Sequence, residues 1–118
     1  MKTLFILNDP PYGTERSYNA LRLARELLKN AVATHAVKVF LLGDAASCAK
    51  AGQKVPQGYY SVEALLQGVS ERGGEIGVCG TCMDARGLAD TELAKGCARS
   101  TMAQLAEWVS WSDRVIAF

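Results

Sequence analysis

Two cysteines and a cation lie close together in the stretch VCGTCMDARG, residues 78–87, and their types and spacing favour thiol chemistry. Cys79 and Cys82 form a CxxC pair directly after the alternating run EIGV, which is typical of a strand. A thiol reacts as its thiolate, whose formation is favoured near a helix N-terminus or a cation. Gly80 lets the backbone come close to the sulfur, and Arg86 is a candidate cation. The stretch therefore predicts a reactive thiol where a strand hands over to a helix.

The CxxC spacing alone leaves several kinds of site open. A thioredoxin-like dithiol is the most familiar of them. Thioredoxin-like proteins carry a cis-proline beyond the motif, whereas Pro10, Pro11 and Pro56 all precede it here. A further interpretation is two small buried hydrophobic side chains, since free cysteine is often buried. A third is a sulfur carrier, in which one thiolate accepts a sulfane sulfur as a persulfide.

A zinc site is the remaining interpretation, and it needs about four ligands. Outside the CxxC pair only Cys48, Cys97 and His35 are available, and they are singly placed along the chain. We therefore expect no metal. Cys48, in a run of small residues, and Cys97, near a short predicted strand, are expected to pack rather than react.

The elements that must position these thiols alternate between strands and helices. Continuous apolar runs predict buried strands at residues 4–7, 37–42, 76–78 and 115–118, with a short strand near Cys97. Helical spacing predicts a helix that carries Ala20, Ala24, Leu27, Leu28 and Ala31, and others at residues 45–51, 61–73, 90–95 and 101–112. This pattern predicts an α/β fold: a three-layer α/β/α sandwich with a mostly parallel sheet of about five strands. At 118 residues the chain is one domain, residues 1–118.

Polar residues are expected to start several of these helices. Thr14 or Ser17 is the predicted cap of the first helix, Ser61 of the helix before the site, and Ser100 of the last. In the last helix, one apolar stripe is predicted from Met102, Leu105, Ala106 and Val109. Trp108 and Trp111 lie beside that stripe, which suggests a subunit interface.

Ligands of such sheets bind at the carboxyl ends of the strands. Three predicted loops leave that edge, at residues 8–16, 43–44 and 79–87, and they bring Tyr12 and Asp44 to the thiols. Tyr12 either lines the site or is a structural cap of its Pro-Gly loop. Asp44 either holds a substrate or caps a helix, and we favour the cap. Asp84 either caps a helix or pairs with Arg86, and a carboxylate near the sulfur would oppose thiolate formation.

Charge and hydropathy exclude several functional classes. The 13 Lys and Arg are scattered among 12 Asp and Glu, for a net charge of +1, so no nucleic-acid surface is expected. The apolar run at residues 4–7 is too short for a signal peptide or a membrane span. We therefore expect no membrane association and a cytoplasmic protein, in which cysteines are mostly reduced.

Taken in order along the chain, these pieces resemble the small DsrE-like proteins of intracellular sulfur handling, in particular the YchN-like branch. The resemblance covers nearly the whole chain, and the order and spacing of its segments carry it. These segments are residues 8–13, 17–24, 39–45, 52–54 with 58–59, 79–82 with Asp84 and 86–87, and 106–108 with 113–115.

The resemblance implies a three-layer α/β fold that assembles into trimers and hexamers. It also implies a relay in which persulfide sulfur passes from a donor protein to an acceptor protein, without a cofactor. By the family's spacing, Cys79 is the reactive cysteine, and the pair Arg86-Gly87 is its companion. We therefore expect a sulfurtransferase-like carrier. Its expected catalytic residues are Cys79, Cys82 and Arg86, and its expected substrate-binding residues are Tyr12, Asp44, Gly80, Thr81 and Gly87.

Cys82 departs from the relay pattern, because relay members have small apolar residues after the reactive cysteine. A second thiol at this position could attack a Cys79 persulfide, release sulfide and leave a disulfide. The alternative function is therefore a non-catalytic, oligomeric binding or redox-regulatory subunit with a Cys79/Cys82 dithiol.

Overall fold

The computed structural model of the chain describes residues 1–30, 33–56 and 60–118. In these residues five strands form a single sheet in the order β4-β3-β2-β1-β5, and every neighbouring pair is parallel. The strands are β1 (Lys2–Leu7), β2 (Ala36–Leu41), β3 (Glu75–Cys79), β4 (Cys97–Ser100) and β5 (Arg114–Ala117).

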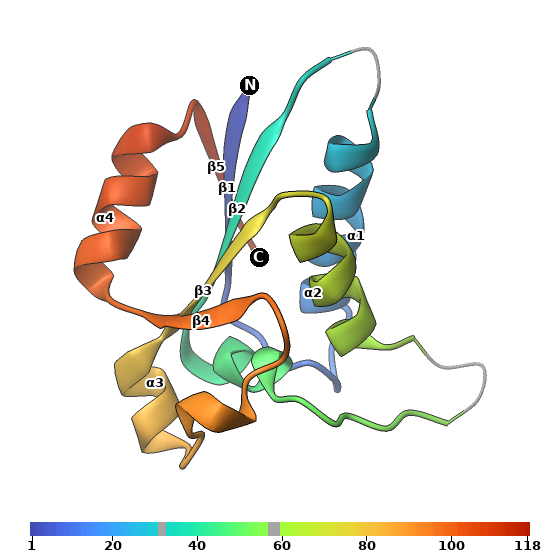
Figure 1. Cartoon of the computed structure of the whole chain (residues 1–118), viewed down its shortest axis with the longest axis vertical. Helices are drawn as coiled ribbons and strands as arrows, with labels where there is room; N and C mark the ends of the chain where they lie inside the picture. The colour runs from blue at the N-terminus through green and yellow to red at the C-terminus, as the bar shows by residue number, and fades with distance from the viewer. Residues whose placement is uncertain (31–32, 57–59) are drawn as a thin grey trace.

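Helices cover both faces of this sheet (Figure 1). The helices α1 (Arg16–Lys29) and α2 (Val62–Glu71) pack side by side on one face, and α4 (Met102–Trp111) covers the other. Three short helices lie at the edge where the strands end: η1 (Gly43–Ala49), α3 (Gly80–Ala85) and η2 (Asp90–Glu92), of which η1 and η2 are 3₁₀ helices. The prediction of a three-layer α/β/α sandwich is confirmed.

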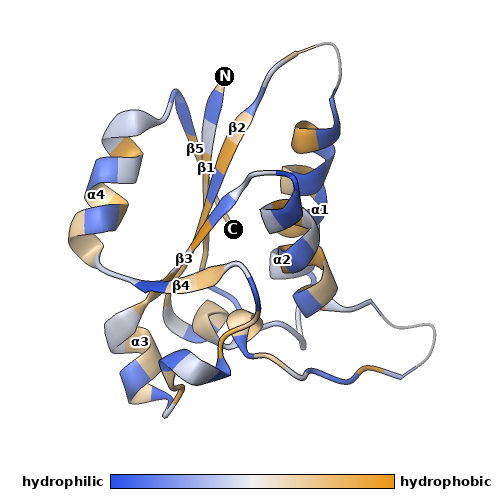
Figure 2. Ribbon diagram, in the orientation of Figure 1, coloured by the Kyte–Doolittle hydropathy of each residue, from blue (hydrophilic) through white to orange (hydrophobic). Residues whose placement is uncertain are grey.

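The central strands are the apolar core of the molecule, as the hydropathy colouring in Figure 2 shows for β1 and β2. Phe5 on β1 and Phe40 on β2 are fully buried, because α1 and α2 cover one face and α4 the other. Burying such a side chain stabilises the fold by about 1.5–3 kcal/mol. Strands buried on both faces read as continuous apolar runs, which is why the sequence identifies them.

The predicted cap of α1 is wrong. Glu15 occupies the N-cap position, and its side chain makes no capping hydrogen bond. Thr14 Oγ1 accepts a hydrogen bond from the Arg16 N–H at 3.3 Å, while Ser17 lies inside the helix, buried, and donates to the Asp9 carbonyl at 2.8 Å. The loop before α1 is therefore fixed by Asp9, which also accepts from the Thr14 hydroxyl at 3.0 Å.

Of the other two predicted caps, one is confirmed and one is wrong. Ser61 caps α2 as predicted, since its hydroxyl accepts from the Ala64 N–H at 3.2 Å. The cap of α4 is Thr101 and not Ser100, because Ser100 is still paired with Cys79 in the sheet. The β4 strand thus runs one residue further than the capping pattern indicates.

The apolar stripe predicted for α4 is also wrong, because its residues do not all face the sheet. Leu105 and Trp108 face the sheet, and the Trp108 ring meets Phe40 edge to face with ring centroids 5.9 Å apart. Met102 and Val109 point outward instead and are 62% and 45% exposed. The stripe therefore mixes the inner and outer faces of the helix.

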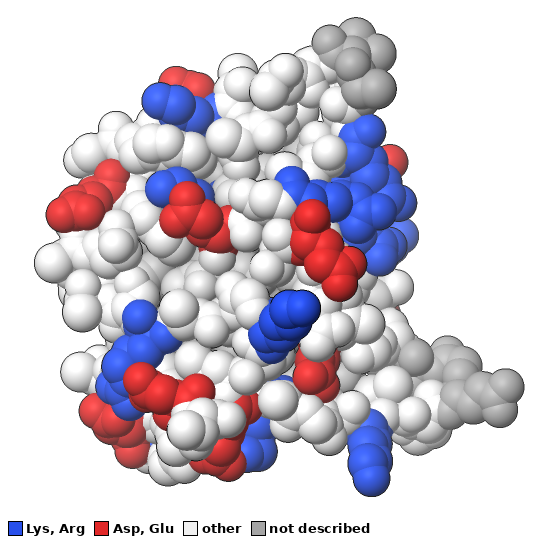
Figure 3. Space-filling model, in the orientation of Figure 1, with Lys and Arg blue, Asp and Glu red and all other residues white. Residues whose placement is uncertain are grey.

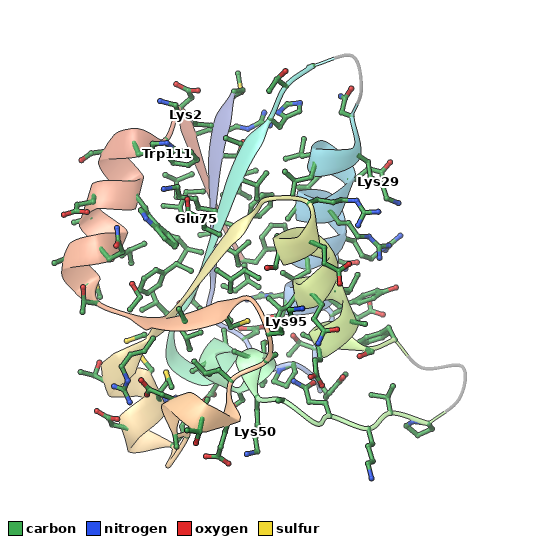
Figure 4. All side chains as sticks on the ribbon, viewed as in Figure 1. Lys2, Lys29, Lys50, Glu75, Lys95 and Trp111 are labelled. Atoms are coloured by element: carbon green, nitrogen blue, oxygen red, sulfur yellow. The ribbon has the colours of Figure 1, made fainter. Side chains whose placement is uncertain are left out.

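Trp111 lies at the far end of α4 from α3, beside Lys2, as Figure 4 shows. The Lys38 ammonium also lies over its ring, 4.5 Å from the centroid. Both lysines come from the sheet, so these cation–π contacts fasten the end of α4 to β1 and β2. The suggested interface role of the tryptophans does not hold for Trp108, which is core.

The short elements match less closely. The helix expected at residues 90–95 is the single 3₁₀ turn η2, and the one expected at 45–51 is η1. The expected end of the first helix at Ala31, and Gly58 and Tyr59 of the resemblance, lie outside the described residues. No helix among the described residues combines the length and the apolar character that crossing a membrane requires.

Both charge signs are interspersed over the face seen in Figure 3, with basic side chains gathered on the α1 side. Seven ion pairs are found among the described residues, and their side chains are mostly exposed. Pairs of this kind contribute little to stability.

Candidate functional site

The CxxC pair lies at the junction of β3 and α3, as the sequence predicts. Cys79 is the last residue of β3 and the N-cap residue of α3, and Cys82 is the third residue of the helix. The neighbouring strands β2 and β4 end beside this junction and continue into η1 and α4. The β3–α3 junction therefore lies between η1 on one side and the start of α4 on the other (Figure 1).

Cys79 is nearly buried, with 5% of its surface exposed. It packs in a small apolar cluster beneath α4 with Phe40, Leu105 and Trp108. An open pocket of about 250 Å³ leads from solvent to this residue. Besides Cys79, its lining residues are Gly80, Thr81, Asp84, Arg99, Ser100, Thr101 and Met102.

The pKa of the Cys79 thiol is lowered by a balance of opposing effects. Burial raises it, but hydrogen bonding from the Cys82 thiol and the Thr81 hydroxyl, together with the backbone N–H groups of Cys82 and Thr81, outweighs burial and lowers the pKa. The Thr81 oxygen lies 3.3 Å from the Cys79 sulfur. The Cys79 side chain makes no capping hydrogen bond to α3. The donors around Cys79 favour its thiolate over its thiol.

Cys82 faces the opposite side of the junction. The Gly43 N–H, at the start of η1, donates a hydrogen bond to the Cys82 sulfur at 3.1 Å. The hydrogen bond to Cys79 raises the pKa of Cys82, and burial and the Cys79 charge raise it further. The Gly43 N–H and the Arg86 charge act against this rise. The interaction between the two thiols therefore shifts their pKa values in opposite directions.

Arg86 makes its hydrogen bonds to Asp44 and to the backbone of Cys82. Its guanidinium donates to Asp44 Oδ1 through Nη2 at 2.7 Å and through Nε at 3.1 Å, and Nη1 donates to the Cys82 carbonyl at 3.1 Å. The expected helix-cap role of Asp44 is wrong, because Leu42 is the N-cap residue of η1 and Asp44 lies within the first turn. The expected role of Arg86 as companion cation of Cys79 has no direct contact to support it.

Arg99 is the residue at this site that the sequence did not identify. From β4 it donates to Asp84 at 2.8 Å, to Asp90 at 2.6 Å and to the Gly80 carbonyl at 3.1 Å. The hydrogen bond and charge of Arg99 lower the pKa of Asp84, so this carboxylate is paired with Arg99 and not with Arg86. The short strand predicted near Cys97 is confirmed as β4, but the register that pairs Val78 with Arg99 is not visible in the sequence.

The remaining predicted site residues divide into two groups. Gly80 and Thr81 line the Cys79 pocket, and Gly87 ends the turn after α3 with a φ of +64°, which glycine adopts without strain. Tyr12 does not join them. Its hydroxyl accepts from the Val62 N–H at 3.3 Å, and its ring packs against Tyr60 at the start of α2.

The other two cysteines are structural in their surroundings. Burial raises the pKa of Cys48 to about 12. Burial, with a smaller effect of the Glu63 charge, raises the pKa of Cys97 to about 12 as well. Among residues 1–30, 33–56 and 60–118, no three His, Cys, Asp or Glu side chains gather in a way that could hold a metal ion.

Known sequences resemble this chain over nearly its whole length. The family model described as "DsrE/DsrF-like family" matches residues 1–118. An uncharacterised protein of Methanopyrus kandleri, MK0008, is 39% identical over 113 residues, which cover 96% of this chain and 90% of that protein. Protein YchN of Escherichia coli K12 is 32% identical over 117 residues, covering 99% of this chain and 98% of YchN.

Solved structures give the same picture for the fold. The crystal structure of YchN from E. coli superimposes with a TM-score of 0.92 at 32% identity, covering 99% of this chain and 98% of YchN. A protein of unknown function from Methanobacterium thermoautotrophicum, MTH1491, has a TM-score of 0.77 at 11% identity, covering 99% of this chain and 98% of its own. At that identity the second match concerns the fold alone.

Proposed function

Because this chain belongs to the DsrE/DsrF-like family, we propose that it carries sulfur as a persulfide on Cys79 between two partner proteins. The observation that carries the proposal is the state of this thiol. Of the four cysteines, Cys79 is the one whose pKa is lowered, and it lines an open pocket. A thiolate in such a pocket can react with a partner that reaches into it.

The loading step is an attack of the Cys79 thiolate on the outer sulfur of a donor persulfide, R–S–SH. A bond forms between Cys79 Sγ and the outer sulfur, the bond between the two donor sulfurs breaks, and the donor leaves as the thiolate R–S⁻. In the delivery step an acceptor thiolate attacks the same outer sulfur, and Cys79 leaves as a thiolate again. The Thr81 hydroxyl and the N–H groups that lower the pKa of Cys79 also make it a good leaving group.

The pocket sets what can reach the thiolate. Its volume of about 250 Å³ is too small for a folded domain, so donor and acceptor must present their sulfur on a protruding loop or tail. Thr101 and Met102, at the start of α4, form the outer part of the lining, and Met102 is 62% exposed. An exposed methionine beside a reactive thiol suits contact with more than one partner, because its side chain adapts to different surfaces.

Intact-mass spectrometry after incubation with a cysteine desulfurase and cysteine tests the proposal. The test uses Cys82→Ser, which lacks the second thiol that could release the sulfur. The expected result is a gain of one sulfur, about 32 Da, that is lost when Cys79→Ser is added and kept when Cys97→Ser, the matched control at a half-buried thiol, is added instead. No gain in Cys82→Ser, or a gain that persists when Cys79→Ser is added, contradicts the assignment of Cys79 as the carrier.

A redox-regulatory dithiol is the second candidate function. It is favoured by the interaction between the Cys79 and Cys82 thiols, which lowers the pKa of the first and raises that of the second. A low-pKa thiol beside a protonated one is the arrangement that disulfide exchange requires. A Cys79–Cys82 disulfide that forms reversibly in glutathione buffers, in a protein that never gains sulfur from the desulfurase, supports this function over the carrier.

We also propose that the chain acts in the cytoplasm as a homo-oligomer, a trimer or hexamer. Apolar side chains remain exposed on α4 and β5, at Met102, Val109 and Val115, and they are candidates for burial between copies. Sedimentation velocity measures the assembly directly. A monomer at micromolar concentration contradicts this part of the proposal and leaves the thiol chemistry unaffected.

A further inference from the structure

The two thiols of the CxxC pair have different neighbours at the β3–α3 junction. Cys79 lines the pocket beneath the start of α4, and Cys82 is absent from that lining. Cys82 is instead held from the η1 side, where its sulfur accepts the Gly43 N–H at 3.1 Å. A sulfur added to Cys79 therefore has room to extend into the pocket, away from η1.

This sidedness has a geometric consequence for a loaded Cys79. Thiol–disulfide exchange requires the attacking sulfur to approach the bond from behind, opposite the leaving sulfur. The outer sulfur of a Cys79 persulfide extends into the pocket, whose lining does not include Cys82, while the Gly43 N–H holds the Cys82 sulfur from the η1 side. Cys82 is thus placed to attack the inner sulfur, whereas a partner entering through the pocket meets the outer sulfur.

Resting on the persulfide chemistry proposed above, we propose that Cys82 clears an undelivered sulfur from Cys79 as hydrogen sulfide. The Cys82 sulfur forms a bond to Cys79 Sγ, and the bond between Cys79 Sγ and the outer sulfur breaks. The bonding electron pair leaves with the outer sulfur, which also takes the proton lost by Cys82. The balance is Cys79–S–SH plus Cys82–SH giving a Cys79–Cys82 disulfide plus H₂S. The sulfane sulfur is reduced by two electrons, and the thiol pair is oxidised by two.

Loading itself prepares Cys82 for this attack. In the empty protein the hydrogen bond to Cys79 and the Cys79 charge are the effects that hold the pKa of Cys82 above its usual value. Once Cys79 Sγ is bonded to a second sulfur, it is no longer a thiolate. The hydrogen bond that the Cys82 thiol donates to this thiolate is then lost. The Gly43 N–H and the Arg86 charge, which lower the pKa of Cys82, then act with less opposition. Loading therefore removes effects that disfavour the thiolate of Cys82.

The site then has two outcomes that depend on the partner. An acceptor thiolate in the pocket takes the outer sulfur and returns Cys79 to its thiolate. Without an acceptor, Cys82 releases the sulfur as sulfide, and the disulfide blocks further loading until a dithiol reductant restores both thiols. The second thiol thus makes loading conditional on the presence of an acceptor.

A single-turnover experiment with glutathione persulfide, without oxygen or added reductant, tests this inference. The wild-type protein and Cys82→Ser are compared by intact mass and by sulfide trapping with a bimane reagent. Serine is the matched variant because its hydroxyl can still donate to Cys79 but cannot form a disulfide, and Cys82→Ala serves as a second variant without the donor.

The expected result is one equivalent of sulfide per wild-type chain, which ends two hydrogens lighter than the dithiol form. Cys82→Ser is expected to keep one extra sulfur, about 32 Da, and to release no sulfide. If the wild-type protein keeps its extra sulfur as long as Cys82→Ser does, the clearing inference is wrong and the carrier function stands. If neither protein gains sulfur, the carrier function fails and the inference fails with it. A glutathione adduct on Cys82→Ser also overturns the inference, because the sulfide then comes from the donor.

Discussion

At the scale of single residues, Cys79 shows how burial and hydrogen bonding compete over one thiol. Burial opposes the thiolate of Cys79, as it does for Cys48, whose pKa is raised to about 12. The side chains of Cys82 and Thr81 and their backbone N–H groups outweigh burial at Cys79 and lower its pKa. Cys79 therefore differs from Cys48 in the donors within three residues of it and in the open pocket that it lines.

Replacing Thr81 by valine tests this balance. The change keeps the shape of the side chain and removes the hydroxyl that lies 3.3 Å from the sulfur, so the pKa of Cys79 should rise. Alkylation of Cys79 by iodoacetamide at neutral pH should slow about tenfold, as expected for loss of a hydrogen bond to a charged group. Peptide mapping of alkylated protein over a pH series measures this. Thr91→Val, an exposed threonine in η2, is the control, and equal rates for the two variants would remove Thr81 from the site.

Asp44 and Arg86 should shift Cys82 in opposite directions. Arg86→Gln removes the charge that lowers the pKa of Cys82, so the pH midpoint for Cys82 alkylation should rise. Asp44→Asn keeps the Oδ1 acceptor that holds Arg86 but removes the neutralising carboxylate, so the midpoint should fall. Both measurements are made in a Cys79→Ser background, which isolates the second thiol. Shifts in the same direction would mean that the pair acts only by supporting the local structure.

At the scale of secondary-structure elements, the site depends on contacts between elements that are distant in the sequence. The β3–α3 junction was predictable because strand, glycine and cysteines are neighbours in the chain. The role of Arg99 was not, since the four residues of β4 have no apolar period and the partners of Arg99 lie in α3 and η2. The inner face of α4 was also misjudged, because Met102, Leu105 and Val109 share one helical spacing while only Leu105 faces the sheet.

The packing of α4 on β3 gives a stability prediction. A Cβ at Gly77 would lie 3.1 Å from the Trp108 ring and 3.2 Å from the Phe40 ring, on a strand between two packed layers. Gly77→Ala should therefore lower the free energy of unfolding by about 1–3 kcal/mol. Gly68→Ala in α2 is the same chemical change where the nearest atoms belong to the flexible Arg25 and Arg72 side chains, and it should raise stability by about 0.5–1 kcal/mol. Urea denaturation of both variants tests the contrast, which equal effects would contradict.

At the scale of the whole molecule, the parallel sheet was the most predictable property, because strands covered on both faces need long apolar runs. The position of β1 in the sheet, with β2 on one side and β5 on the other, is set by the connections between elements and not by any local pattern. The packing of the whole molecule also gives the cysteines two kinds of surroundings. Cys79 and Cys82 lie at the edge where the strands end, and Cys48 belongs to the main core between the sheet, α1 and α2.

Thiol labelling should report this division. In the folded protein a disulfide reagent should modify Cys79 rapidly, whereas Cys48 and Cys97 should stay protected because their pKa values of about 12 keep them protonated at neutral pH. Adding denaturant should expose all four thiols together in one cooperative transition. Mass spectrometry of pulse-labelled protein measures the order. Labelling of Cys48 as fast as that of Cys79 without denaturant would show that the core opens locally.

The cover of Cys79 comes from α4, which follows the cysteines in the chain. During synthesis the two thiols therefore leave the ribosome before the helix that shields one of them exists. A growing chain already has the neighbours that acidify Cys79, but it has neither the apolar lid nor the pocket that selects what may approach. The pocket is thus among the last features that the nascent protein acquires, and until then Cys79 is open to any oxidant.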